Sequence, residues 1–181
     1  MTNLAGKAIK RMLALIVPVI VASAGCLVAT PTAAAATHSP TTSSRASARS
    51  VSTLDTEAPA FAEQALKLVN QQRAEAGCAS LPLVAKLQFP AERQSRDQAA
   101  RDRLGHDGAN GSTVNSRLSG LGYSRWAENV AQFPSAQAAV HFWSTSRGHR
   151  ATMRNCAFRE TGLAVARSNS GKFYWTETFG D

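Results

Sequence analysis

The chain has 181 residues, of which 18% are charged, and its formal net charge is +8 at pH 7. This length favours a single domain. The arginines are scattered singly, without a basic run or interleaved aromatic residues, so the charge predicts a basic surface that attracts anionic envelope polymers and argues against specific nucleic-acid binding.

The first 36 residues have the order of a secretory signal peptide. Basic residues at positions 7, 10 and 11 precede an apolar run over residues 12–28, and a small-residue region with four consecutive alanines follows. We expect cleavage near residue 36, which gives a secreted chain without a membrane span. Its net charge is +5, because the leader holds three of the 20 basic residues and none of the 12 acidic ones (17 − 12).

Two other interpretations of the leader stay open. A retained membrane anchor is the first, and Pro18 within the apolar run argues against it. The minority alternative is a lipid anchor on Cys26, although Ser23 stands where such a site needs a large apolar residue.

Residues 37–59 consist mainly of Ser, Thr, Ala and Pro, with few large apolar side chains. Such a segment buries too little apolar surface to offset its ordering entropy, so we predict a disordered linker. The folded domain is then predicted over residues 60–181, which is 181 − 59 = 122 residues and enough for one core.

Apolar periodicity predicts four helices in this domain, over residues 60–76, 90–104, 113–121 and 136–144. The first has one apolar face and ends before Gly77, and the second begins at Pro90, a residue suited to the first turn of a helix. The second helix is largely polar, and its inner stripe consists of the small residues Ala91, Ser95 and Ala99. Small inner residues predict close packing of this helix.

Two alternating runs end the chain, over residues 161–167 and 172–180, with the turn Ser168–Gly171 between them. They predict an antiparallel β-hairpin. Helices followed by a terminal hairpin make the fold class α+β. The architecture becomes a three-layer α-β-α sandwich if the stretch Ala127–Val130 pairs as a further strand.

Cleavage of the leader changes the count of cysteines. Cys26 leaves with the leader, so Cys78 and Cys156 remain. A pair of cysteines in an exported chain predicts one disulfide. The bridge closes a loop of 78 residues (156 − 78), which stabilises the fold by about 4 kcal/mol in the chain-entropy model.

Four ionisable residues at the ends of elements or beside strands are candidate site residues: His106, Glu128, His149 and Glu160. Two histidines and two carboxylates are suitable ligands for a first-row metal ion, and a zinc site commonly takes three or four such groups. The same residues could instead form a hydrogen-bonded network that lines a cleft, with each histidine oriented by a glutamate. We interpret His38 and His141 as linker and surface residues.

Four runs of residues follow one another over residues 60–181: V-N-Q-Q-R-A-E-A-G-C, A-E-N-V-A, G-H-R-A-T-M-R-N-C-A-F-R-E-T-G-L-A-V-A and Y-W-T-E-T-F-G. Together they resemble the CAP superfamily of SCP-like extracellular proteins, specifically its small bacterial branch. The resemblance implies an α-β-α sandwich with a large central cleft. It also implies a site of two histidines and two glutamates in that cleft, which match His106, Glu128, His149 and Glu160. The paired His106 and His149 imply a site for a divalent cation, with zinc as the expected ion.

Three positions depart from the family's pattern. Ala127 stands in place of the glycine of the G-E-N-like motif, and Glu177 stands in place of the usual glutamine of the last strand. Gly105, directly before His106, stands where family members more commonly have an aromatic residue and a serine leading to this histidine. None of these changes removes a candidate site residue, but Glu177 adds a carboxylate whose direction the sequence does not reveal.

Sequence motifs of two hydrolase classes are missing. The chain has neither H-E-x-x-H nor G-x-S-x-G. We interpret Ser144 and Ser146, near His149, as structural residues at the end of a helix, and a nucleophilic Cys156 conflicts with its disulfide. Family members are mostly described as binding or signalling proteins. We therefore expect a secreted, monomeric, non-catalytic binding module whose cleft holds a divalent cation or a small ligand, and whose partner is a small molecule or a component of the cell envelope or of a host.

Two alternative functions stay open. A metal-assisted hydrolase would use Glu128 or Glu160 as its general base. A lipid or sterol carrier, which the resemblance to some eukaryotic relatives allows, would need an exposed apolar loop. The candidate segments are instead rich in Gly, Ser and Arg.

Overall fold

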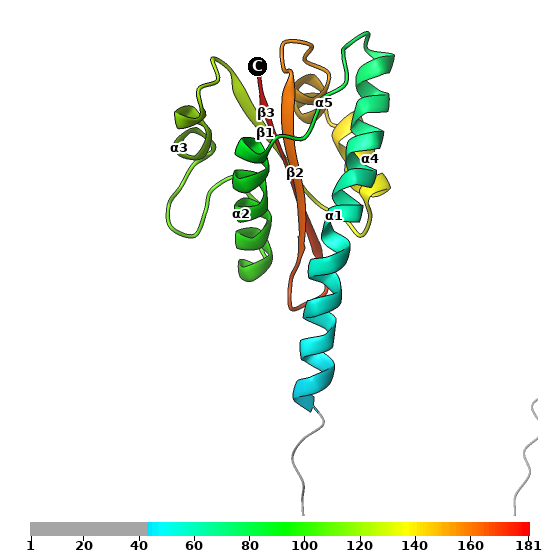
Figure 1. The fold of residues 1–181 in the computed structure, drawn as a ribbon, viewed down its shortest axis with the longest axis vertical. Helices are drawn as coiled ribbons and strands as arrows, with labels where there is room; N and C mark the ends of the chain where they lie inside the picture. Colours follow the sequence, from blue (N-terminus) through cyan, green and yellow to red (C-terminus); the bar gives the residue numbers. More distant parts are fainter. Residues whose placement is uncertain (1–42) are drawn as a thin grey trace, which may run out of the picture. The chain divides into compact units, whose positions relative to one another are not determined.

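The structure is a computed structural model that describes the backbone of residues 43–181 and the side chains of residues 57–181. The predicted signal peptide, the candidate lipid anchor Cys26 and residues 37–42 of the predicted linker lie outside the described residues. The described elements are α1 (Ser43–Glu75), α2 (Ala85–Arg101), α3 (Val114–Leu118), the 3₁₀ helix η1 (Ser119–Leu121), β1 (Trp126–Gln132), α4 (Ala136–Thr145), α5 (Arg147–Met153), β2 (Glu160–Arg167) and β3 (Phe173–Gly180) (Figure 1).

Helix α1 begins far upstream of its predicted start at residue 60. Residues 43–59 are helical, where the sequence predicted a disordered linker, and Pro59 lies inside the helix. The packed turns around Ala65 and Val69 provide the nucleus from which the helix extends toward the N-terminus, since extension costs less than nucleation. Propensity does not account for the extension, because the segment is rich in Ser and Thr and Pro59 has no N–H to donate. Among the described residues, no helix combines the length and the hydropathy that a bilayer crossing requires.

The three strands form one antiparallel sheet in the order β1-β3-β2. Strands β2 and β3 make the predicted hairpin, and Gly171 in its turn adopts a φ of 89°. The stretch Ala127–Val130 does pair as a strand, since it lies within β1. The α+β prediction is confirmed, and Figure 1 shows α2 on one side of the sheet and α1, α4 and α5 on the other.

Helix α2 lies unusually close to its face of the sheet. A Cβ atom at Gly162 would come within 2.2 Å of the backbone of Leu87, so only glycine fits at this crossing. Polar side chains join the two layers. The hydroxyl of Thr178 donates to the carbonyl oxygen of Leu87 at 2.9 Å, and the hydroxyls of Ser95 and Thr176 lie 3.0 Å apart.

The opposite face of the sheet carries the apolar core. Five of its large side chains, from β2, β3, α4 and α5, are each at most 1% exposed: Trp143, Met153, Leu163, Trp175 and Phe179. Burial of each such side chain contributes about 1.5–3 kcal/mol to folding. Both tryptophans keep a hydrogen bond, because Trp143 donates to the carbonyl of Val130 and Trp175 to that of Phe133.

Two further helices differ from the prediction. Helix α2 begins at Ala85 rather than residue 90, because the carbonyl of Val84 accepts from the N–H groups of Leu87 and Gln88. It ends before the predicted residue 104, since Asp102 adopts a left-handed φ of 49° that stops the helix. The second difference is α5, a two-turn helix where the sequence indicated only a corner around His149.

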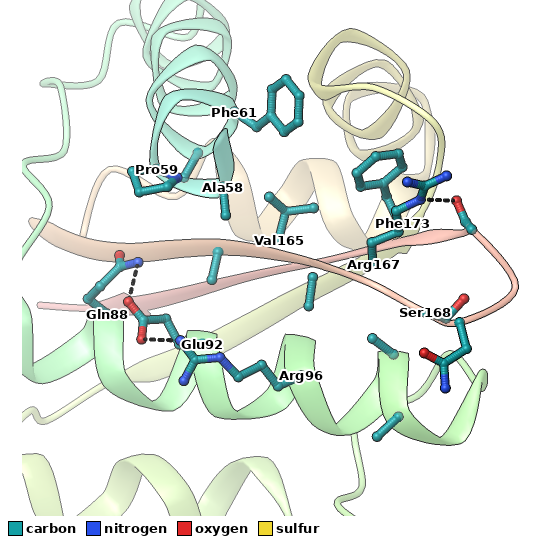
Figure 2. Close-up of a pocket in the computed structure, with 17 residues that line it drawn as sticks. Ala58, Pro59, Phe61, Gln88, Glu92, Arg96, Val165, Arg167, Ser168 and Phe173 are labelled. Atoms are coloured by element: carbon teal, nitrogen blue, oxygen red, sulfur yellow. Dashed lines mark hydrogen bonds and ion pairs between the residues drawn. The ribbon is translucent and has the colours of Figure 1, made fainter. Parts of the chain in front are cut away.

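The outer edge of β2 borders a cavity of about 900 Å³ that lies between α1 and α2 (Figure 2). Strand β2 is an edge strand, so its outward backbone groups face this region.

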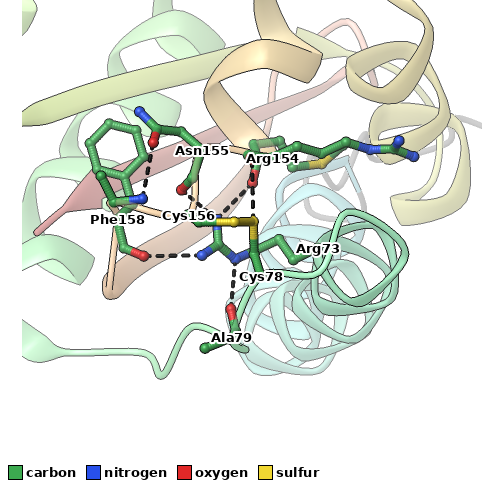
Figure 3. Close-up of a disulfide and its surroundings, with 9 residues drawn as sticks. Arg73, Cys78, Ala79, Arg154, Asn155, Cys156 and Phe158 are labelled. Carbon is green, nitrogen blue, oxygen red and sulfur yellow. Dashed lines mark hydrogen bonds between the residues drawn. A yellow bond between two sulfur atoms is a disulfide. The ribbon is translucent and has the colours of Figure 1, made fainter.

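The predicted disulfide between Cys78 and Cys156 is confirmed (Figure 3). Beside it, the fully buried guanidinium of Arg73 donates hydrogen bonds of 2.8–3.0 Å to four backbone carbonyls, those of Ala79, Met153, Asn155 and Phe158. The disulfide and Arg73 together hold the end of α1 against the segment that leads into β2.

Candidate functional site

His106 and Glu128 lie together, as one half of the predicted site. Nδ1 of His106 is 2.9 Å from Oε1 of Glu128, a carboxylate without solvent exposure on β1. The other oxygen of Glu128 accepts from the guanidinium of Arg117 at 2.7 Å, and Arg117 also donates to the carbonyl of His106 at 2.8 Å. Because the carboxylate can only accept, the proton of a neutral His106 is on Nδ1 and the lone pair is on Nε2.

His149 lies on α5, on the other side of β1. Its Nδ1 is 2.8 Å from the hydroxyl of Ser146, and its carbonyl accepts from the side-chain amide of Asn129 at 3.1 Å. The ring of Phe142 packs 5.0 Å from the imidazole between centroids. Burial lowers the pKa of His149, and the positive charge of His106 lowers this pKa further. His149 thus lies beside β1, an edge strand of the sheet, as the contact with Asn129 shows.

Glu160 has a different set of contacts. It opens β2, where its carboxylate accepts from the hydroxyl of Tyr123 and lies 3.7 Å from the ammonium of Lys86. Burial, followed by the bond to this carboxylate, raises the pKa of Tyr123 above its usual range. Strand β3 separates Glu160 from the Glu128 strand. Within residues 57–181, no three side chains of His, Cys, Asp or Glu are grouped so that they could hold a metal ion.

The serines near His149 have structural contacts. Ser144 donates to the carbonyl of His141 one turn earlier, at 2.8 Å, while Ser146 contacts the imidazole as described above. Both oxygens of Glu128 already have partners, His106 at Oε1 and Arg117 at Oε2.

Glu177, the departure whose direction the sequence left open, points into the protein. Its side chain is fully buried on the face covered by α1, α4 and α5, and its Oε2 has no hydrogen-bond partner among the described residues. Its Oε1 lies 3.4 Å from the hydroxyl of Thr161. Burial raises the pKa of Glu177 to about 8, although Thr161 and the charge of Arg73 act in the opposite direction.

Sequence reasoning missed two residues that position the histidines, Arg117 and Asn129, whereas Ser146 was singled out as a structural residue near His149. Arg117 is one of many scattered arginines, and nothing in its neighbours marks it as the partner of Glu128. Asn129 offered a weak signal, because it follows Glu128 in a motif already singled out.

Comparison with known proteins identifies the family. The model of the CAP family, described as the cysteine-rich secretory protein family, matches residues 66–179. An extracellular protein from Bacillus anthracis that contains an SCP domain is 25% identical, with a TM-score of 0.60, over 79% of this chain and 45% of its own. An outer surface protein of Borrelia burgdorferi has 15% identity and a TM-score of 0.59, over 64% of this chain and 88% of its own.

NaASP2, whose crystal structure was solved with Zn²⁺, is 13% identical with a TM-score of 0.51, over 66% of this chain and 78% of its own. A search of curated proteins found no match. The chain spans less than half of the Bacillus protein, and the match to the family covers most of the described domain. This chain belongs to the cysteine-rich secretory protein (CAP) family.

Proposed function

We propose that the chain is a secreted, non-catalytic binding module in which His106 and His149 hold a divalent cation beside β1. The observation that carries the proposal is the arrangement of the two imidazoles. Each has its Nδ1 engaged, one by Glu128 and the other by Ser146, and the pKa of His149 is lowered by burial and then by the charge of His106. Each Nε2 is then the nitrogen left for a metal ion, and a carboxylate behind a ligating histidine is the usual outer partner in zinc sites.

The chemistry of these residues fits zinc. Neutral imidazole is the form that ligates a metal ion, and the lowered pKa of His149 favours that form at neutral pH. Two histidines leave the other positions of a zinc ion to water or to a ligand group, which suits a binding site. The zinc-bound structure of NaASP2, which shares the fold, is consistent with the proposal.

The alternatives have less support. A metal-assisted hydrolase needs a carboxylate that acts as general base beside the metal ion. Both oxygens of Glu128 are engaged by His106 and Arg117, and Glu160 opens the opposite edge strand, where one of its oxygens is bound by Tyr123 and lies near Lys86. No observation on the described loops favours a lipid carrier. Secretion is supported by the order of the N-terminal residues and by the secretory character of the family.

Isothermal calorimetry of the full chain with zinc chloride at neutral pH tests the cation site. We expect saturable binding near one equivalent, and loss of that binding in both His106→Ala and His149→Ala, because either substitution leaves a single imidazole. His141→Ala is the matched control, since His141 is an exposed histidine on α4. Absence of binding by the unaltered chain, or equal binding by all three variants, contradicts the proposal.

A further inference from the structure

The cavity borders the outer edge of β2, whereas the histidines lie beside β1, and these two strands are the opposite edges of the sheet. Figure 2 shows the groove between α1 and α2, with β2 along its floor. Phe61 of α1 and Phe173 of β3 form an apolar wall, and their rings meet edge to face at 6.1 Å between centroids. The small side chains of Ala99 and Ala100 line the α2 side.

The chain itself covers the first part of this edge with an extended segment. The N–H of Thr161 donates to the carbonyl of Pro82 at 3.0 Å, and the N–H of Val84 donates to the carbonyl of Thr161 at 3.0 Å. Leu83 thereby pairs with Thr161 as a parallel bridge. The edge of β2 thus already accepts a strand-like segment.

A side-chain amide covers the next outward position. The amide of Gln88 accepts from the N–H of Leu163 at 3.0 Å and donates to its carbonyl at 2.9 Å. These are the two hydrogen bonds that one residue of an added antiparallel strand would make with its N–H and C=O. Outward groups recur at every second residue of a strand, so Val165 and Arg167 are the next two outward positions.

The edge is uncovered where the groove lies. Over residues 57–181, no hydrogen bond pairs the outward N–H and C=O of Val165, and both Val165 and Arg167 line the groove. An edge with unpaired backbone groups is a template for another strand. The main-chain groups of the edge bind the added strand, and the walls of the groove select the side chains of that strand.

We propose that this groove binds an extended peptide segment of a partner protein, which pairs with β2 at Val165 and Arg167. The walls predict the sequence of the segment. Side chains that point toward Phe61 and Phe173 are large and apolar, and the alternate ones, toward Ala99 and Ala100, are small. This site goes beyond the cation site and does not depend on it.

Nuclear magnetic resonance of the ¹⁵N-labelled full-length chain tests the proposal, with the capped peptide acetyl-Ser-Val-Ala-Val-Ala-Ser-amide as the probe. We expect saturable shifts of the Val165 and Arg167 amide signals and slower hydrogen exchange at Val165, because its N–H gains an acceptor. Two control peptides carry N-methyl groups on alternate residues, one for each register. At least one of them loses the shifts, since it keeps the side chains but lacks the donors that face β2.

A substitution in the groove provides a second test of the proposed peptide site. Ala100→Trp fills the groove from an exposed position of α2, and we expect it to abolish the shifts. Ala85→Trp is the matched control, because Ala85 is an exposed alanine of the same helix that does not line the groove. Shifts with both N-methylated peptides equal to those with the unmethylated peptide, no shifts at Val165 with the unmethylated peptide, or shifts with sodium decanoate and none with the peptide would each overturn the proposal.

Discussion

Glu177 lies on β3 with its carboxyl group enclosed by the apolar side of the sheet, and one of its oxygens has no hydrogen-bond partner among the described residues. An ionised carboxylate is costly in such surroundings, so burial raises its pKa from 4.5 to about 8. The protonated form therefore predominates at neutral pH. Folding stability then depends on pH through this group, because the unfolded chain releases the proton at a much lower pH.

Glu177→Gln tests this dependence. For the unaltered chain, the stability contributed by the protonated carboxyl is full below pH 4.5, falls as the pH rises from there to about 8, and is lost above it. The neutral glutamine removes this loss, so we expect the variant to be more stable at pH 9 by an amount on the order of a few kcal/mol. Urea unfolding from pH 5 to pH 9 measures the effect. Glu63→Gln, at an exposed position of α1, is the control, and parallel curves for Glu177→Gln and the unaltered chain would refute the assignment.

At the scale of elements, the contact between α2 and the sheet depends on small residues from both sides. Ala91, Ser95 and Ala99 are all buried, as their spacing predicted, and Gly162 lets the backbone of Leu87 approach β2. This close approach brings the hydroxyl of Thr178 within hydrogen-bond distance of the helix backbone. The packing thus supplies hydrogen bonds where a larger side chain would supply only apolar contact.

Gly162→Ala therefore destabilises the domain. The added methyl group meets backbone atoms that cannot rotate away, and overpacking of this kind typically costs about 1–3 kcal/mol. Gly148→Ala is the matched control, because nothing lies within 4 Å of its added Cβ and alanine favours the helix α5. Chemical denaturation compares the two variants. A Gly162→Ala midpoint equal to that of the unaltered chain would show that α2 can move away at no cost.

At the scale of the whole molecule, the disulfide joins parts of the domain that are 78 residues apart. It links the end of α1 to the segment before β2, and Arg73 binds four carbonyls at the same place. The covalent link mainly restricts the unfolded chain, while Arg73 stabilises the folded one. The domain should therefore keep its fold without the link, at lower stability.

The double variant Cys78→Ser and Cys156→Ser separates the two contributions. We expect its free energy of unfolding to be lower by about 4 kcal/mol, since the unfolded chain regains the entropy of an open loop. Urea unfolding followed by circular dichroism measures it, and dithiothreitol should lower the stability of the unaltered chain alone. An unchanged midpoint in the double variant would mean that the link adds nothing beyond what Arg73 supplies.

Local patterns in the sequence determined much of the fold. The hairpin of β2 and β3, the small-residue stripe of α2 and the pairing of Cys78 with Cys156 follow from alternation, helical spacing and a cysteine count. The family resemblance also predicted that His106 and Glu128 lie together, and their side chains are in contact. These features could be predicted because each depends on neighbours in the chain or on residue types.

Only the tertiary structure decided how those residues meet. The order β1-β3-β2 brings Arg117 to Glu128 and directs Glu160 to Tyr123, and no sequence spacing encodes either contact. The burial of Glu177 and the uncovered edge of β2 likewise depend on which helix lies on which face. Local propensity selects helices and strands, whereas contacts between distant segments follow from the packing of the whole domain.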